Sequence, residues 1–395
     1  MTRFLPKTFW QLVFAALMAA SAYVTFVRFY HGLGSSTNLN DQFPWGLWIG
    51  FDVLCGVGLA AGGFTLAATV HIFHLERFKP IVRPAILTAF IGYLLVIVAL
   101  MFDLGQPWRI WHPLIMWNPR SVMFEVGWCV TLYTTVLALE FAPVVLERFG
   151  LRKPLRILKS VMLPLVIAGV LLSTLHQSSL GSLYLIMPHK LSPLWYSPLL
   201  PILFYISAIG VGLAMTIFES YHSSRAFGRQ LEFPLVKRLS EVLAVVLAFY
   251  LALRLVDMKS RGAFQLLESP GIERWLFGLE MVLMALPMLL LFREKIRNQP
   301  RAIYWCSVSY LMGFMAHRMN VAITGIESAS GVRYTPKWME VVITLGLIAL
   351  GFAVFRWVTA LLPIFSDEEE RPSIAIKVKP MPVRNDAFQT VAPVR

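Results

Sequence analysis

Long apolar runs separated by short polar segments recur along the whole chain. A helix needs about 20 such residues to cross a bilayer and satisfies its own backbone hydrogen bonds there, whereas barrel strands would be short and alternating. The pattern therefore predicts an all-α polytopic membrane protein. Ten spans are expected, roughly at residues 8–30, 45–73, 81–104, 121–144, 157–175, 196–220, 236–256, 273–292, 302–322 and 337–362.

The two ends of the chain differ in character: the first is apolar and the last is polar. The first apolar run follows two basic residues and includes small residues near Ala19–Ala22, as a signal peptide does, but it is too long for a typical signal core. We expect an uncleaved first span. The polar sequence after Pro363 predicts a polytopic domain over residues 1–363 and a disordered cytoplasmic tail over 364–395.

Composition and charge support the membrane assignment. Hydrophobic residues make up 57% of the 395 positions and charged residues 14%, against about 25% charged residues in soluble domains. With the N-terminus inside, the inner segments hold 23 of the 35 Lys and Arg residues and the outer loops hold eight. This bias places both termini in the cytoplasm and the chain in the cytoplasmic (inner) membrane. The net charge of +13 is thus a topology signal, and no nucleic-acid partner is expected.

Four ionisable residues lie within the spans near the outer surface: Asp52, Asp103, Glu125 and His176. Such groups are costly in hydrocarbon and usually line a functional cavity. Because four consecutive spans bring them to one leaflet, we expect a shared polar cavity. Singly, each has a simpler interpretation, with His176 as a solvated helix cap and Asp103 as a helix-end residue.

The expected cavity suits a quinone, whose two-electron reduction also takes up two protons. A histidine titrates near neutral pH, and a buried carboxylate can join it. The predicted quinone site consists of His176, Asp103, Glu125 and Asp52, with Arg109 and Trp117 from the adjoining loops. The loop tryptophans are also typical of an interfacial aromatic belt.

A polar stripe on the fourth span leads inward from this site. Glu125, Tyr133 and Glu140 fall on one helix face at 100° per residue. Glu140 lies about 22 Å further along the helix than Glu125. The stripe predicts a proton pathway towards the cytoplasm, and an ion pair of Glu140 with a basic residue such as Arg148 is the alternative.

The other charged residues of the spans have structural interpretations. Arg254 or Arg318 is expected to form a buried ion pair with Glu280, because charged groups in a membrane tend to pair. Arg28 and Arg356 are expected to snorkel to the nearer surface.

Neither a metal site nor a catalytic residue is predicted on this chain. The three cysteines lie within spans without a CxxC motif, so no iron–sulfur cluster or covalent haem is expected. The eight histidines do not form two stacked axial pairs; only His71 and His222 fall at a common level. We therefore expect no haem b.

Several motifs together resemble the NrfD/polysulfide-reductase membrane subunit family. They are Phe43–Gly46 before Asp52, Arg83–Ala85, Asp103–Gly105, Ser121 with Glu125, Ala138–Pro143 and His176–Ser182. The resemblance runs from about Phe43 to Pro363 and is looser beyond the sixth span. Within the family the chain is similar to the integral subunits of hydrogenase-2-type nickel–iron hydrogenases. Ser192 stands where some members have a histidine.

The resemblance implies both a fold and a set of partners. The fold is two four-helix bundles, spans 2–5 and 6–9, with flanking helices. The implied role is a cofactor-free anchor that takes menaquinone or ubiquinone as substrate. Its electrons would come from a periplasmic iron–sulfur subunit and the small and large subunits of a nickel–iron hydrogenase, with proton translocation in some complexes. Three alternatives stay open: an NrfD-type subunit of a different oxidoreductase, a secondary transporter, and a passive anchor without quinone chemistry.

Overall fold

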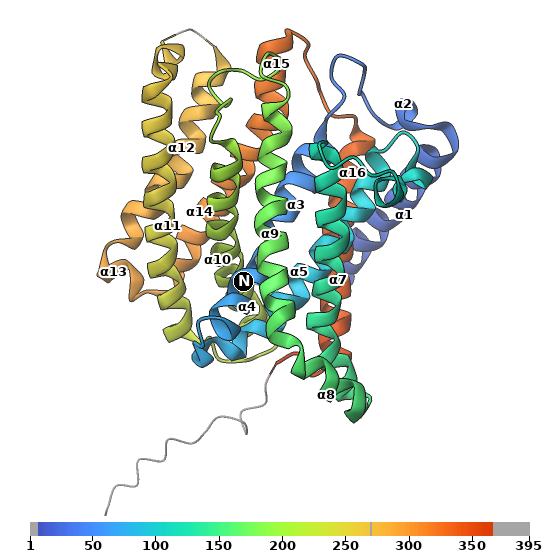
Figure 1. The fold of residues 1–395 in the computed structure, drawn as a ribbon, viewed down its shortest axis with the longest axis vertical. Helices are drawn as coiled ribbons and strands as arrows, with labels where there is room; N and C mark the ends of the chain where they lie inside the picture. The colour runs from blue at the N-terminus through green and yellow to red at the C-terminus, as the bar shows by residue number, and fades with distance from the viewer. Residues whose placement is uncertain (1–6, 269–270, 366–395) are drawn as a thin grey trace, which may run out of the picture. The chain divides into compact units, whose positions relative to one another are not determined.

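The computed structural model describes residues 7–268 and 271–365, which are predominantly helical (Figure 1). Within these ranges, nine helices are long and apolar enough to cross a membrane. The ninth predicted span is helix α14 (Pro300–Met319), which packs among the others but is not one of the nine. Its polar residues His317 and Arg318 are buried inside the protein instead of facing lipid, so its sequence is less apolar.

The first predicted bundle is confirmed. Helix α4 (Gly62–His71) packs on α5 (Lys79–Asp103) and on α9 (Met162–Leu185), and α7 (Val122–Arg148) packs on both α5 and α9. The four helices follow the chain order of spans 2–5. They surround buried aromatic and aliphatic side chains.

The second predicted bundle is confirmed as well. It contains α10 (Leu200–Ala226), α11 (Phe233–Ser260), α12 (Ile272–Leu291) and α14. Helix α10 also packs against α4 and α9, and so joins the two bundles (Figure 1). A glycine allows this contact, because a Cβ atom on Gly212 would lie 2.8 Å from the backbone of Ala61.

The flanking helices are α1 (Lys7–His31) and α16 (Trp338–Leu361), which pack on each other while α16 also packs on α5. The buried Glu340 carboxylate fixes the start of α16. It accepts hydrogen bonds from the backbone N–H groups of Asn38 (3.1 Å) and Lys337 (2.9 Å) and from the Tyr334 hydroxyl. Burial, and then the bond to Glu340, raise the pKa of Tyr334 and keep this phenol protonated.

The second predicted span is interrupted, although its sequence was expected to form one helix. It begins with a π-helical segment, η1 (Trp48–Val53), continues as α3 (Leu54–Leu59) and bends before α4. A second π-helical segment, η5 (Asn320–Thr324), packs against η1 and precedes α15 (Gly325–Ser330). Such segments often occur at functional sites, and η1 carries Asp52.

Short elements connect the spans. They are α2 (Leu33–Ser36), η2 (Glu76–Phe78), η3 (Pro107–Arg109), α6 (His112–Ile115), α8 (Arg152–Ser160), η4 (Ala263–Leu267) and α13 (Glu294–Arg297). Helix α8 is basic and strongly amphipathic, as helices that lie on a membrane surface are. The packed part of the chain extends past Pro363, because Ile364 is buried and the Phe365 ring lies 5.3 Å from that of Phe227. The rest of the predicted tail, 366–395, is outside the described residues.

Candidate functional site

His176 is enclosed within the first bundle. Helix α9 continues to Leu185, and the His176 side chain is fully buried, so its interpretation as a solvated helix cap is wrong. Its Nδ1 atom lies 3.0 Å from the hydroxyl of Tyr93 on α5. Its Nε2 atom has no hydrogen-bond partner among the described residues. One ring nitrogen is therefore held in place while the other is available.

Other polar groups near His176 also lack partners. The Tyr133 ring packs edge-on against Tyr93 with centroids 4.7 Å apart. The Tyr133 hydroxyl lies near Ser173, but neither hydroxyl forms a hydrogen bond of normal geometry in the described structure. Gln177 donates its amide to the carbonyl of Val57 (3.2 Å), while its Oε1 atom is unpaired. We call Tyr93, Tyr133, Ser173, His176 and Gln177 the His176 cluster. Because nearly all buried polar groups in proteins are hydrogen-bonded, these atoms indicate room for water or a ligand.

Glu140 continues the buried face of α7 beyond Tyr133. Its side chain is buried, and a Cβ atom on Gly169 of α9 would lie 3.2 Å from its Oε1 atom. The alternative of an ion pair with Arg148 is wrong, since Arg148 donates to the carbonyl of Leu361 (3.2 Å). The basic groups of Arg83 and Lys159 pair with Glu147 instead. Glu140 is thus a buried carboxyl group without an ion pair among the described residues.

Asp52 and Asp103 lie on the side of the first bundle that faces the flanking helices. Asp52 accepts a 2.7 Å hydrogen bond from the Thr344 hydroxyl of α16. Asp103 ends α5, and one of its carboxylate oxygens is buried without a partner in the described structure. Arg28 of α1 donates to the carbonyls of Phe102 (2.6 Å) and Leu104 (2.5 Å) beside it. Arg28 therefore does not snorkel to the surface, because it caps the end of α5.

Glu125, Arg109 and Trp117 belong to the outer end of α7 and the loop before it. Glu125 is half-buried in the first turn of α7, where the Ser121 hydroxyl accepts from the N–H of Phe124 (3.4 Å) as the helix cap. Arg109 is exposed, and Trp117 is 66% exposed with its ring against Trp128 (5.0 Å between centroids). These residues are accessible from outside the bundle, unlike His176.

The six predicted quinone-site residues thus divide between three places. Among the described residues, no hydrogen bond or ion pair joins His176 to Asp52, Asp103 or Glu125, and the single shared cavity stays a prediction. Sequence reasoning missed Tyr93, the only hydrogen-bond partner of the His176 side chain among the described residues. The available signal was the single tyrosine within the long aliphatic run of the third span.

A second buried polar cluster lies in the other bundle, around Glu280. Its carboxylate accepts from Arg254, Trp195 Nε1 (3.0 Å) and Asn320 Nδ2 (2.9 Å), and its Oε1 atom lies 2.9 Å from His317 Nδ1. The predicted ion pair of Arg254 with Glu280 is therefore confirmed. We call these five residues the Glu280 cluster.

Arg318 does not take part in that ion pair. Its guanidinium lies 3.4 Å from the centroid of the Phe204 ring and donates to the Phe204 carbonyl (3.2 Å) and the Ser207 hydroxyl (3.0 Å). The buried Arg318 charge is thus stabilised by a cation–π contact with Phe204 and by hydrogen bonds to α10.

Comparison with known proteins gives consistent matches across the chain. A family model described as "Polysulphide reductase, NrfD" matches residues 35–328. The chain is 37% identical over 369 residues to a protein of Nitratidesulfovibrio vulgaris Hildenborough, covering 91% of this chain and 95% of the relative. It is 34% identical over 359 residues to the "Probable Ni/Fe-hydrogenase 2 b-type cytochrome subunit" of Escherichia coli K12, covering 89% and 91%. It is 30% identical over 370 residues to the "Menaquinone reductase, integral membrane subunit" of N. vulgaris Hildenborough, covering 86% and 87%.

Proposed function

The chain belongs to the polysulphide reductase NrfD family, and we propose that it is the quinone-reactive membrane subunit of a periplasm-facing oxidoreductase. The observation that carries this proposal is the buried His176 imidazole, held by Tyr93 on one nitrogen and unpartnered on the other. The name of the menaquinone reductase relative supports a quinone as the substrate.

The geometry supports defined roles for His176, Tyr93 and Tyr133. When Tyr93 donates its hydroxyl hydrogen to Nδ1, the Nε2 atom carries the one proton of the neutral imidazole and donates a hydrogen bond to a quinone carbonyl oxygen. It can pass this proton to the reduced quinone as a new proton reaches the ring. Reduction of the quinone by two electrons takes up two protons, and the imidazole has to regain any proton that it gives. Tyr133 and Glu140, on the buried face of α7, form the inward route that supplies both.

The remaining predicted residues serve the outer approach to this site. Asp103 and Glu125 place carboxyl groups at the outer ends of α5 and α7, and Asp52 lies near the inner end of η1. Arg109 and Trp117, with the exposed Trp108 and Trp111, form an aromatic and basic surface for a partner iron–sulfur subunit. The excess of Lys and Arg at the opposite end, which includes α8, makes that end cytoplasmic and this one periplasmic.

The proposed partner enzyme is a nickel–iron hydrogenase, as the name of the E. coli relative suggests. The menaquinone reductase relative favours a different oxidoreductase as the second candidate. Purification of the chain from its native membrane separates the two, because a hydrogenase partner brings nickel with the iron–sulfur subunits. A transporter would purify without either.

A b-type haem, as in the E. coli relative's name, is bound by two facing histidines. Here His222 Nε2 lies 3.1 Å from the Tyr304 hydroxyl. His176 and His317 belong to different bundles, and α10 packs between their helices with the Phe204 ring 6.1 Å from that of His317. These histidines do not fit a bis-histidine haem, and we propose a subunit that works without one.

The proposal is tested by replacing His176 with Asn in the assembled complex. We expect quinone reduction to fall by about 10²–10⁴-fold, the usual contribution of a general acid, while reduction of a soluble dye by the partner subunits is unchanged. His189→Asn is the matched control, since His189 is exposed in the loop after α9. Normal quinone reduction by the His176 variant would refute the proposed role.

A further inference from the structure

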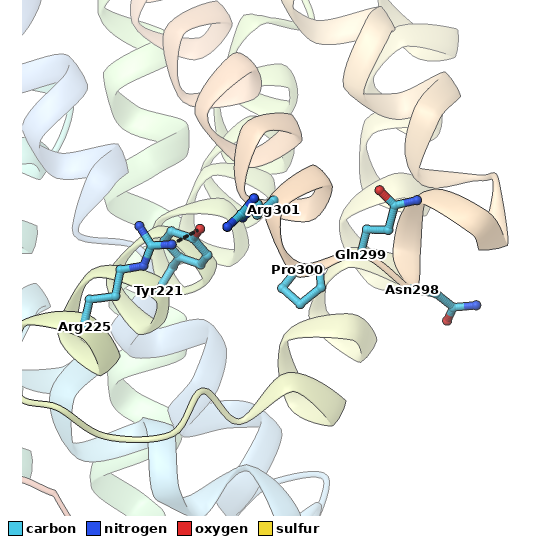
Figure 2. Close-up of a pocket in the computed structure, with 6 residues that line it drawn as sticks. All are labelled: Tyr221, Arg225, Asn298, Gln299, Pro300 and Arg301. Carbon is cyan, nitrogen blue, oxygen red and sulfur yellow. Dashed lines mark hydrogen bonds between the residues drawn. The ribbon is translucent and has the colours of Figure 1, made fainter. Parts of the chain in front are cut away.

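A cavity of about 420 Å³ opens between the end of α10 and the start of α14 (Figure 2). Tyr221 and Arg225 line it from α10, and Pro300 and Arg301 line it from α14. Figure 2 shows both guanidinium groups near Tyr221, in the space between the two helices. Helix α10 begins at the outer end of the bundle, so this cavity at its other end lies on the opposite side from Asp103. His176 does not line the cavity.

The lining of this cavity offers hydrogen-bond donors and positive charge. Arg225 Nη2 donates to the Tyr221 hydroxyl at 2.7 Å, which leaves the hydroxyl hydrogen free to donate. The Tyr221 ring is fixed between Arg225, whose guanidinium carbon lies 4.3 Å from its centroid, and the stacked ring of Tyr304 at 4.3 Å. Gln299 adds an amide at the rim.

No acidic residue of the described part of the chain forms an ion pair with these two arginines. The lining contains no carboxylate, and among the described residues neither Arg225 nor Arg301 forms an ion pair. Two arginines and a free hydroxyl select an anion with several acceptor oxygens, and a phosphate group has this chemistry.

An apolar groove of about 230 Å³ lies on the other side of the first turns of α14. Leu286, Pro287 and Leu290 line it from α12, and Ala302 and Trp305 line it from α14. Trp305 is 65% exposed although it lies within a membrane-spanning bundle. Arg301 lines the basic cavity and Ala302 lines the groove, so the two features meet at consecutive residues.

We propose that the cavity between α10 and α14 binds the phosphate headgroup of an anionic phospholipid, with an acyl chain along the groove between α12 and α14. A lipid fits better than a soluble phosphate because the basic site adjoins an apolar one at the end of spanning helices. Basic pockets between such helices bind anionic headgroups. This site is independent of the quinone site, and either can fail without the other.

The test measures lipid binding to the full-length chain by native mass spectrometry, with phosphatidylglycerol and phosphatidylcholine offered at equal concentration. The informative variant is Arg225→Gln with Arg301→Gln. Its matched control is Arg293→Gln with Lys295→Gln, which removes two exposed charges near α13 that line neither cavity. A third arm offers soluble glycerol phosphate as a competitor.

We expect the native chain to prefer phosphatidylglycerol and the Arg225/Arg301 variant to lose about 30-fold in that preference, since each basic residue near an anionic lipid contributes about fivefold. The control variant should keep the preference. Arg301→Gln alone should lose about fivefold, which gives a readout if the double variant does not purify. Equal binding of both lipids by the native chain, an unaffected double variant, or displacement by glycerol phosphate at the lipid's own concentration would each overturn the proposal.

Discussion

The two bundles each bury a histidine within a polar cluster, but they satisfy it differently. In the second bundle, His317 Nδ1 faces the Glu280 carboxylate, and that carboxylate also accepts from Arg254, Trp195 and Asn320. In the first bundle, His176 Nδ1 faces the hydroxyl of Tyr93 and no carboxylate. The Nε2 atom of each histidine has no partner among the described residues.

The difference separates a network built on a buried ion pair from one built on neutral groups. A buried carboxylate with four partners has little capacity to bind anything else, and its main effect is to fix the four segments that supply those partners. Unpartnered buried groups are costly unless water or a ligand completes them. The first bundle therefore has unpaired neutral groups that a ligand could complete. In the second bundle the Glu280 carboxylate is saturated, and the unpaired atoms beside it belong to His317 (Nε2) and Arg318 (Nε and Nη1).

The largest effect on stability is expected for Glu280→Gln. This change leaves the Arg254 guanidinium buried without its counter-charge, and breaking such a pair costs about 3–5 kcal/mol. Equilibrium unfolding of the purified protein in mixed micelles measures the change. Glu147→Gln is the control, because its ion pairs with Arg83 and Lys159 are partly exposed and contribute about 0–1 kcal/mol. Equal stability of the two variants would contradict the structural role of the Glu280 cluster.

A pair of matched tyrosine variants sharpens the same comparison. Tyr93→Phe removes the hydroxyl that positions His176, and quinone reduction should fall about five- to tenfold, as expected for a hydrogen bond of about 1 kcal/mol. Tyr250→Phe removes the hydroxyl 3.2 Å from Arg254 Nη1 in the second bundle. It should lower stability by about 1 kcal/mol and leave the quinone rate unchanged. The measurement is the steady-state rate of quinone reduction by both variants. Equal losses of rate would contradict the assignment of quinone chemistry to the first bundle alone.

The spans and their grouping into bundles could be predicted because apolar length and family pattern determine them. The depth of His176 could not, because the polar residues after it suggested a helix end. In the structure Ser178 and Ser179 donate to carbonyls of their own helix, at Thr174 (2.9 Å) and Leu175 (2.7 Å), so α9 continues through them.

The sequence also could not predict the π-helical start of the second span or the partners of single side chains. The π-helical segment η1 packs against η5, which lies far away along the chain, and no local composition encodes that contact. Likewise Tyr93 and Thr344 became visible as partners of His176 and Asp52 only once the helices were placed.

A smaller and more specific effect is expected for Glu140→Gln. Glu140 is buried on α7 without an ion pair, so loss of its titratable group should slow proton delivery and leave the fold intact. In liposomes, the pH change that accompanies quinone reduction should drop several-fold for this variant. Glu147→Gln on the same helix is the control. Unchanged proton movement in the Glu140 variant would remove the inward route.

The smallest effect is expected for Asp52→Asn, and it tests how far the reactive region of the first bundle extends. An asparagine can still accept the hydrogen bond from the Thr344 hydroxyl, so stability should change by less than about 1 kcal/mol. Asp52 faces α16 while His176 faces Tyr93, and quinone reduction should therefore stay within about twofold of normal, well above the His176→Asn rate. A loss as large as that of the His176 variant would place Asp52 beside the quinone. It would also restore the single outer cavity that the four ionisable residues predicted, and the boundary between the two polar regions of the first bundle would disappear.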